Sequence, residues 1–179
     1  MVEIPFWAAE LLFTVIWLTV RIAVWIRQRR IDWKREAVLL LMYVNLFVLI
    51  RIVFFPAERI EGRIQPLLFD PGAVFPFRIK YVPLVTLFQY DTLRDMLLNV
   101  IGNVAIFVPT GIILPILYRK LNSPGKVVFT GFCMSLCIEI LQLPFSVRMS
   151  DVDDLILNTL GPAAGYLIYS MIKKKTPAS

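Results

Sequence analysis

The sequence predicts an all-α fold, a polytopic membrane helix bundle of about five transmembrane helices, and three observations support this prediction. Of the 179 residues, 58% are hydrophobic and 18% are charged, and the mean hydropathy is +0.72, far more apolar than an ordinary soluble domain. Five apolar runs approach the length that spans a bilayer. Basic residues gather beside alternate ends of these runs. We expect one integral membrane domain over residues 1–179.

The predicted transmembrane helices are the apolar runs of about 20 residues, the length that an α-helix needs to cross the hydrocarbon core. They cover residues 6–26, 36–55, 98–118, 126–145 and 154–172. The last run is the shortest, so its helix could begin earlier. Acidic rather than basic residues precede the first run, which predicts an uncleaved anchor instead of a signal peptide.

Basic residues predict the direction of insertion. They gather after the first, third and fifth runs, in RQRRIDWKR, RKLNSPGK and KKK. The positive-inside rule makes these segments cytoplasmic, which predicts the N-terminus outside and the C-terminus in the cytoplasm. The connections 56–97 and 146–153 are then extracytoplasmic. Prolines and aromatic residues in the longer connection predict an ordered loop at the membrane interface, with an interfacial or re-entrant piece at 79–90.

The composition excludes several kinds of chemistry. There is no histidine, which excludes catalysis and metal binding through imidazole. Cys133 and Cys137 lie four residues apart in an apolar run, where we expect them to pack as small side chains. The net charge of +6 comes from residues beside the apolar runs, so we expect no nucleic-acid partner.

Polar residues interrupt the apolar runs at helical spacing, so they share helix faces instead of scattering. Under the predicted topology they gather in the outer half of the membrane. Because ionisable groups within a membrane usually mark functional sites, we expect these residues to line a polar, ligand-binding cavity. The expected lining residues are Arg51, Asn99, Asn103, Glu139, Gln142, Arg148, Asp151, Asp153, Asp154 and Asn158.

Charge pairing and structural roles bear on this expectation. An unpaired charge in hydrocarbon costs at least about 2.5 to 3.5 kcal/mol on insertion scales, so we expect Arg51 to pair with Glu139 or with an aspartate. Asn and Gln side chains also join membrane helices structurally, at about 0.6 kcal/mol each, and Asp151 or Asp153 suits a helix N-cap. Structural roles do not explain Glu139, Arg148 and three aspartates within one short stretch.

Glycine and proline predict where the helices pack or bend. Gly161 and Gly165 form a GxxxG pair, which we expect to pack against the third or fourth helix or to support a homodimer. Gly102 should let a neighbouring helix approach closely, and Pro109 should weaken or bend the third helix. The expected packing residues are Gly102, Pro109, Gly111, Gly161 and Gly165.

These motifs follow one another in a recognisable order: Asn, Gly, Asn and Pro-x-Gly, then Glu-x-x-Gln, then Arg, Asp-x-Asp-Asp, Asn-x-x-Gly and a further glycine. The pattern resembles the VanZ-like family of bacterial membrane proteins over about residues 80–172. The matching residues are Asn99, Gly102, Asn103, Pro109, Gly111, Glu139, Gln142, Arg148, Asp151, Asp153, Asp154, Asn158, Gly161 and Gly165. The resemblance implies a multi-pass protein of the bacterial cell membrane, in a family whose namesake contributes to teicoplanin resistance.

We expect a binding protein rather than an enzyme. It would bind an amphiphile or a cell-envelope component in a polar cavity that faces the extracytoplasmic side, and so reduce susceptibility to lipoglycopeptides such as teicoplanin. The expected partners are membrane lipids and either a lipoglycopeptide antibiotic or a lipid-linked cell-wall precursor. We assign no catalytic residue, metal or cofactor.

Two alternatives stay open at this point. An intramembrane hydrolase or transferase acting on a lipid-linked substrate would use Asp151, Asp153 and Asp154 to hold Mg²⁺ or Ca²⁺, with Glu139 as the base. A small proton-coupled transporter or flippase would use Glu139 as a protonatable group. Five helices without inverted repeats argue against an alternating-access transporter that acts alone.

Overall fold

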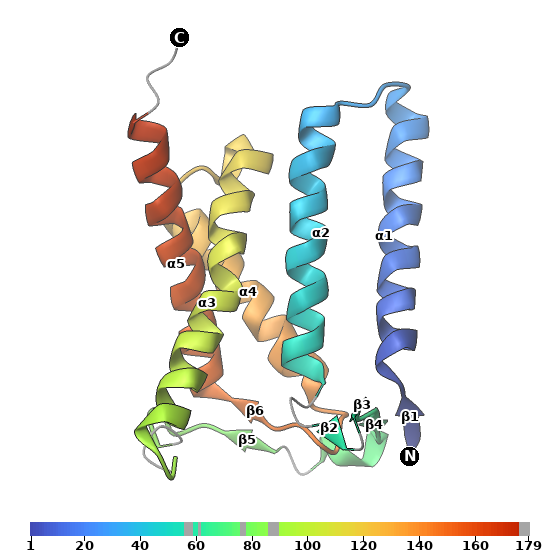
Figure 1. The fold of residues 1–179 in the computed structure, drawn as a ribbon, viewed down its shortest axis with the longest axis vertical. Helices are drawn as coiled ribbons and strands as arrows, with labels where there is room; N and C mark the ends of the chain where they lie inside the picture. The colour runs from blue at the N-terminus through green and yellow to red at the C-terminus, as the bar shows by residue number, and fades with distance from the viewer. Residues whose placement is uncertain (56–58, 61, 76–77, 86–89, 176–179) are drawn as a thin grey trace.

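Five long helices form the bundle in the computed structural model, which describes residues 1–55, 59–60, 62–75, 78–85 and 90–175 (Figure 1). The helices are α1 (Phe6–Gln28), α2 (Trp33–Phe54), α3 (Leu93–Leu117), α4 (Pro124–Gln142) and α5 (Val152–Lys175). All five are long and apolar enough to cross a membrane. The predicted polytopic helix bundle is confirmed, and the chain is a multi-pass membrane protein.

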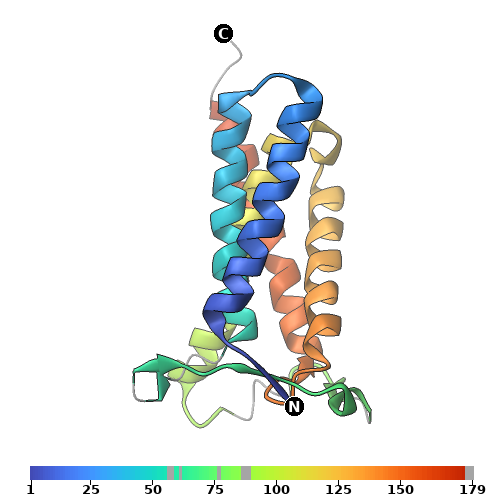
Figure 2. The same ribbon diagram turned by 90° about the vertical axis from the view of Figure 1, so that its right-hand side faces the viewer.

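Short strands form a layer across the end of the bundle where the N-terminus lies, while α5 ends at the opposite end of the bundle (Figure 2). The strands are β1 (Val2–Ile4), β2 (Arg59–Ile60), β3 (Arg63–Ile64), β4 (Leu67–Phe69), β5 (Ile79–Lys80) and β6 (Ser150–Asp151). They pair as β1 with β4 and β2 with β3, both antiparallel, and β5 with β6, parallel. We call this end of the bundle the strand end. The sequence analysis did not predict these strands.

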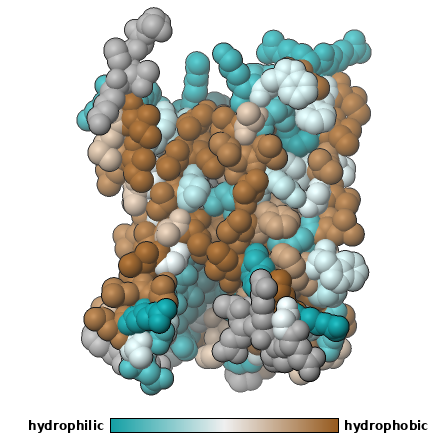
Figure 3. All heavy atoms as spheres, in the orientation of Figure 1, coloured by the Kyte–Doolittle hydropathy of each residue, from teal (hydrophilic) through white to brown (hydrophobic). Residues whose placement is uncertain are grey.

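The opposite end, which we call the basic end, carries the connections between α1 and α2 and between α3 and α4, together with the end of α5. The second connection contains a 3₁₀ turn, η3 (Arg119–Leu121). Hydrophobic residues cover the middle of the face in Figure 3, and hydrophilic residues lie toward both ends. The side of the membrane on which each end lies stays a prediction from the basic residues.

The longer connection, between α2 and α3, is held to the segment that follows α4. The backbone N–H of Asp70 donates to the carbonyl of Pro144 at 2.8 Å, and the N–H of Ser146 donates to the carbonyl of Leu68 at 3.0 Å. A 3₁₀ turn, η1 (Pro71–Val74), follows β4. Of the piece expected to be interfacial or re-entrant, 79–80 forms β5 and 86–89 lies outside the described residues.

Helix ends differ from the expected bounds for local reasons. α3 begins at Leu93, earlier than expected, because the hydroxyl of Thr92 accepts a hydrogen bond from the N–H of Asp95 at 3.1 Å and caps the helix. α4 ends at Gln142, earlier than expected, because Pro144 has no N–H with which to continue the helix.

α1 packs on α2 and lies on the far side of α2 from α3 and α5 (Figure 1). The rings of Phe13 and Tyr43 stack with centroids 5.5 Å apart, and the hydroxyls of Thr14 and Tyr43 lie 2.8 Å apart. Near the basic end Arg21 forms an ion pair with Glu36. These contacts make α1 and α2 a hairpin.

The most extensive helix contact is that of α3 with α5, and three glycines allow it. A Cβ at Gly165 would lie 2.1 Å from the carbonyl oxygen of Val108, and a Cβ at Gly161 would lie 2.5 Å from the Cβ of Phe107. On the facing helix, a Cβ at Gly111 would lie 2.3 Å from the carbonyl oxygen of Pro162. Only glycine permits this approach of two helix backbones.

The GxxxG pair therefore lies against α3 within a single chain. Gly161 and Gly165 are both buried there, so they do not supply a free surface for a homodimer. Gly102 differs from the expectation, because no atom lies within 4 Å of the position that its Cβ would take. The expected close approach of a neighbouring helix at Gly102 is wrong.

Two polar side chains join α2 to α3 deep in the bundle. The amide Nδ2 of Asn45 donates to the carbonyl of Ile106 at 3.1 Å, and the hydroxyl of Thr110 donates to Oδ1 of Asn45 at 2.7 Å. Thr110 is fully buried. Pro109 lies inside α3, which continues as one helix to Leu117.

We predict that Gly165→Ala lowers the melting temperature of the purified protein in detergent by several degrees. The added Cβ would force α3 away from α5, and overpacking of this kind costs about 1 to 3 kcal/mol. Gly125→Ala is the matched control, because a Cβ at Gly125 meets no atom within 4 Å. Equal melting temperatures for the two variants would contradict the close contact of α3 with α5.

Candidate functional site

A cavity of about 570 Å³ lies between α2, α3, α4 and α5, near the strand end of each helix. Figure 3 shows hydrophilic residues at the floor of a recess between α3 and α2. The polar side chains that line the cavity are Asn99, Asn103, Glu139, Gln142, Arg148, Asp154 and Asn158. The remaining lining is Gly102 with apolar residues from α2, α3 and the segment after α4, including Ile52, Leu98 and Met149.

The structure brings together seven of the ten residues that the sequence analysis expected in a polar cavity. The other three, Arg51, Asp151 and Asp153, lie outside the lining. Each of the seven comes from a position near the strand end of its helix or from the segment between α4 and α5. The helical spacing in the sequence accounts for this convergence, together with the helix directions: α3 and α5 begin at the strand end, and α4 ends there (Figure 1).

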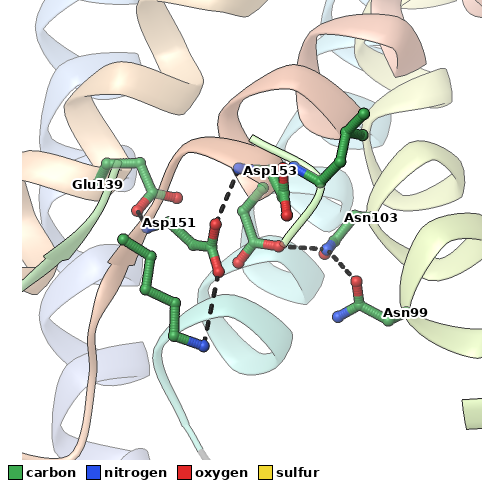
Figure 4. A network of polar contacts seen from close by, with 8 residues as sticks. Asn99, Asn103, Glu139, Asp151 and Asp153 are labelled. Carbon is green, nitrogen blue, oxygen red and sulfur yellow. Dashed lines mark hydrogen bonds and ion pairs between the residues drawn. The ribbon is translucent and has the colours of Figure 1, made fainter. Parts of the chain in front are cut away.

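Asn103 and Asp154 connect the two most closely packed helices within the cavity. The amide Nδ2 of Asn103 donates to Oδ1 of Asp154 at 2.7 Å (Figure 4). Its contact with Oδ1 of Asn99 is longer, at 3.5 Å. Asn103 precedes Val104, whose carbonyl oxygen would lie 2.5 Å from a Cβ at Gly161. The glycine contact therefore brings the Asn103 amide within reach of α5.

Asn158 connects α5 to α4. Its Nδ2 donates to the hydroxyl of Ser135 at 3.1 Å, and its side chain is 2% exposed. The other amide atom, Oδ1, is buried without a hydrogen-bond partner. Buried polar groups are almost always satisfied, so an unpaired amide atom beside a cavity indicates room for a ligand or a water.

Glu139 is tied to the start of α5. Its Oε2 accepts a hydrogen bond from the N–H of Asp151 at 3.0 Å, and its backbone carbonyl accepts from the hydroxyl of Ser150 at 2.7 Å. Glu139 is 7% exposed. Its second oxygen, Oε1, makes no hydrogen bond to the described residues.

Asp151 and Asp153 hold the strand end in place. The carboxylate of Asp151 accepts from the N–H of Asp153 at 2.9 Å, which caps α5, and lies 3.9 Å from Nζ of Lys80 (Figure 4). Oδ1 of Asp153 accepts from the N–H of Leu84 at 2.6 Å. Leu84 has a φ of +68°, a left-handed conformation that is unfavourable for a branched side chain. Asp151 therefore has the predicted N-cap role, whereas Asp153 holds a loop residue instead of a helix N–H.

Arg148 presents a cation to the cavity. Its Nε donates to the carbonyl of Phe54 at 2.8 Å, whereas its Nη2 is buried without a hydrogen-bond partner. Burial lowers the pKa of this guanidinium, Asp154 opposes that effect and Arg51 adds to it. Arginine nevertheless keeps its charge, so the cavity wall has a fixed guanidinium with an unused donor.

Arg51 does not pair with Glu139, and that expectation is wrong. Nη1 of Arg51 donates to the carbonyl of Phe55 at 3.2 Å, and the guanidinium carbon lies 5.6 Å from the centroid of the Phe6 ring. Glu139 accepts its hydrogen bond from the backbone N–H of Asp151 instead. A backbone hydrogen bond, rather than an arginine, compensates the burial of this acid.

Two further residues escaped the sequence analysis. Tyr90 lies close to the acids. Burial first, and then the nearby Asp154, Asp151 and Asp153, raise the pKa of its hydroxyl. Glu10 of α1 is 5% exposed, and both of its carboxylate oxygens are buried without a hydrogen-bond partner. Its position within the first apolar run was the available signal, whereas Tyr90 carried none.

The three aspartates do not converge on one point. Asp151 caps the N-terminus of α5, Asp153 accepts from the N–H of Leu84, and Asp154 accepts from the amide of Asn103. Within the part of the chain that the structure describes, no three acidic or cysteine side chains gather into a group that could hold a metal ion. The three aspartates therefore have separate hydrogen-bond partners.

The chain is similar to known proteins over most of its length. Residues 11–173 match the model of the family described as VanZ/LLP1. Over 102 residues the chain is 29% identical to Protein VanZ of Enterococcus faecium, and the alignment covers 57% of this chain and 60% of that protein. No solved structure matches the chain.

We predict that Asn103→Ala destabilises the protein more than Asn99→Ala does. The first change removes the 2.7 Å hydrogen bond to Asp154, and hydrogen bonds to groups of this kind contribute about 1 to 3 kcal/mol. The second removes only a 3.5 Å contact one turn away on the same helix. Thermal unfolding in detergent measures both variants, and an equal loss would show that Asn103 does not hold α3 to α5.

Proposed function

The chain belongs to the VanZ/LLP1 family, and from this premise we propose that it reduces the susceptibility of a bacterium to teicoplanin and related lipoglycopeptides. The family's namesake is associated with teicoplanin resistance. The protein would act in the bacterial cell membrane by binding an amphiphile or a cell-envelope component. The observation that carries the proposal is the mixed lining of the cavity between α2, α3, α4 and α5.

The lining suits a ligand that is part polar and part apolar. Polar side chains from three helices and Arg148 face the same space as Ile52, Leu98 and Ile106. Ligand sites are commonly apolar cavities with a few polar groups that orient the ligand. A headgroup would meet the polar groups, while the apolar lining would meet hydrocarbon.

Several polar groups in the cavity have hydrogen-bonding capacity left over. Glu139 and Asp154 each use one carboxylate oxygen, on the N–H of Asp151 and on the amide of Asn103. Arg148 and Asn158 each have a buried polar atom without a partner. A bound headgroup would satisfy these atoms, and the hydrogen bonds that hold the four side chains would keep them in place for it.

Gln142 has a structural role in the cavity wall, because its side-chain amide donates to the backbone of α2. Its Nε2 donates to the carbonyl of Val53 at 3.0 Å, which joins the end of α4 to the end of α2. This bond keeps the wall opposite α3 in position. No covalent step is needed for the proposed role, because retention of an amphiphile requires only complementary contacts.

The predicted topology places the cavity in the outer half of the membrane, on the side where lipoglycopeptides meet cell-wall precursors. A ligand held there would be withdrawn from the surface that the antibiotic reaches. The direction of insertion rests on the basic residues at the other end of the bundle.

We predict that Glu139→Gln and Asp154→Asn each remove most of the protection against teicoplanin. Each change takes away a negative charge that would bind a headgroup donor, while the amide keeps the size of the side chain. The measurement is the inhibitory concentration of teicoplanin in a susceptible host that expresses each variant to the wild-type level.

Glu3→Gln is the matched control, because Glu3 is an exposed acid in β1 at the same end of the bundle. This variant should protect as well as the wild type. Full protection by Glu139→Gln and Asp154→Asn, at equal protein level, would contradict the role of the cavity.

A further inference from the structure

An apolar groove lies between α2 and α3, next to the polar cavity. Its volume is about 520 Å³, and its walls include Val44 and Val48 of α2 and Ala105, Pro109 and Ile112 of α3. Asn45 is the one polar residue of its lining among the described residues. Both functional groups of that amide are already used, on the carbonyl of Ile106 and the hydroxyl of Thr110. The groove is therefore suited to hydrocarbon.

The groove and the polar cavity share a wall. Ile106 lines both of them, and no side chain fills the space beside Gly102 one turn earlier. From Gly102 to Pro109 the helix advances about 10 Å toward the middle of the bundle, at 1.5 Å per residue. The polar cavity near the strand end and the apolar groove thus follow one another along α3, in the order of a lipid headgroup and its chain.

The charged residues that line the polar cavity indicate which headgroup fits. Arg148, held at Nε by the carbonyl of Phe54, has its Nη2 buried and unused, which suits an anionic oxygen such as that of a phosphate. Glu139 and Asp154 each offer a second carboxylate oxygen to a donor. A headgroup that combines a phosphate with a primary ammonium satisfies both sets of groups at once.

We propose that the ligand is an aminophospholipid of the surrounding bilayer, with its phosphate at Arg148, its ammonium at Glu139 and Asp154, and one acyl chain in the α2/α3 groove. The second chain stays among the bilayer lipids. This inference rests on the proposed function and names the amphiphile that the cavity binds. Lipids without an ammonium group, such as phosphatidylglycerol or a polyprenyl phosphate, leave the two carboxylates facing oxygen atoms.

Native mass spectrometry of the full chain with defined lipids tests the headgroup. Phosphatidylethanolamine should bind about tenfold more tightly than phosphatidylglycerol, polyprenyl phosphate or a diacylglycerol with the same chains, because one hydrogen-bonded ionic contact is worth about 1.4 kcal/mol or more. Arg148→Gln should remove the preference over diacylglycerol. Equal binding of phosphatidylglycerol or polyprenyl phosphate would overturn the proposal.

A substitution within the groove tests the chain. Val48→Trp should lower the affinity for phosphatidylethanolamine about tenfold, the loss expected when about two buried methylene groups of the chain are displaced. Leu40→Trp is the control, because Leu40 is also an exposed residue of α2 and does not line the groove. Equal affinities for the two variants would overturn the assignment of the groove to the chain.

The two proposals fail in different ways. If lipid selectivity is absent but Glu139→Gln still removes protection against teicoplanin, the aminophospholipid is wrong and the proposed function stands. If phosphatidylethanolamine binds as described but protection is unaffected by Glu139→Gln and Asp154→Asn, the lipid site stands and the proposed function is wrong.

Discussion

The close contact of α3 with α5 is the constraint on which the rest of the structure depends. Glycines at 111, 161 and 165 let the two backbones approach so closely that any Cβ there would collide with a carbonyl oxygen or a side chain. Pro162, between two of these glycines, also lies against Gly131 of α4, so three helices meet at one level. In a bilayer, such packing substitutes for the hydrophobic effect that drives helix association in water.

The polar site follows from that contact. With α3 held against α5, Asn103 reaches Asp154, and with α4 held against Pro162, Ser135 reaches Asn158. The strand end completes the arrangement, because β6 and the start of α5 bring the N–H of Asp151 to Glu139. Two residues that line the resulting cavity, Arg148 and Asn158, each keep a buried polar atom without a hydrogen-bond partner.

The sequence predicted the helices and the polar convergence, because both depend on local spacing. Apolar length marks a spanning helix, and steps of three or four residues place Glu139, Gln142, Asp154 and Asn158 on inward faces. Features that depend on tertiary partners were not predictable. The strands exist because the long connection pairs with distant segments, and Arg51 turns to Phe55 and Phe6 instead of Glu139. Gly102 is small enough for close helix packing, but it lines the cavity instead, and no atom lies within 4 Å of its Cβ position.

A double-mutant cycle between Gly165 and Asn103 tests the central claim most directly, with the free energy of unfolding in detergent as the measured quantity. If the glycine contact positions Asn103 against Asp154, then Asn103→Ala costs clearly less in the Gly165→Ala background than in the wild type. If the two costs instead add within about 0.3 to 0.5 kcal/mol, as they do for independent sites, the α3–α5 contact does not organise the polar site.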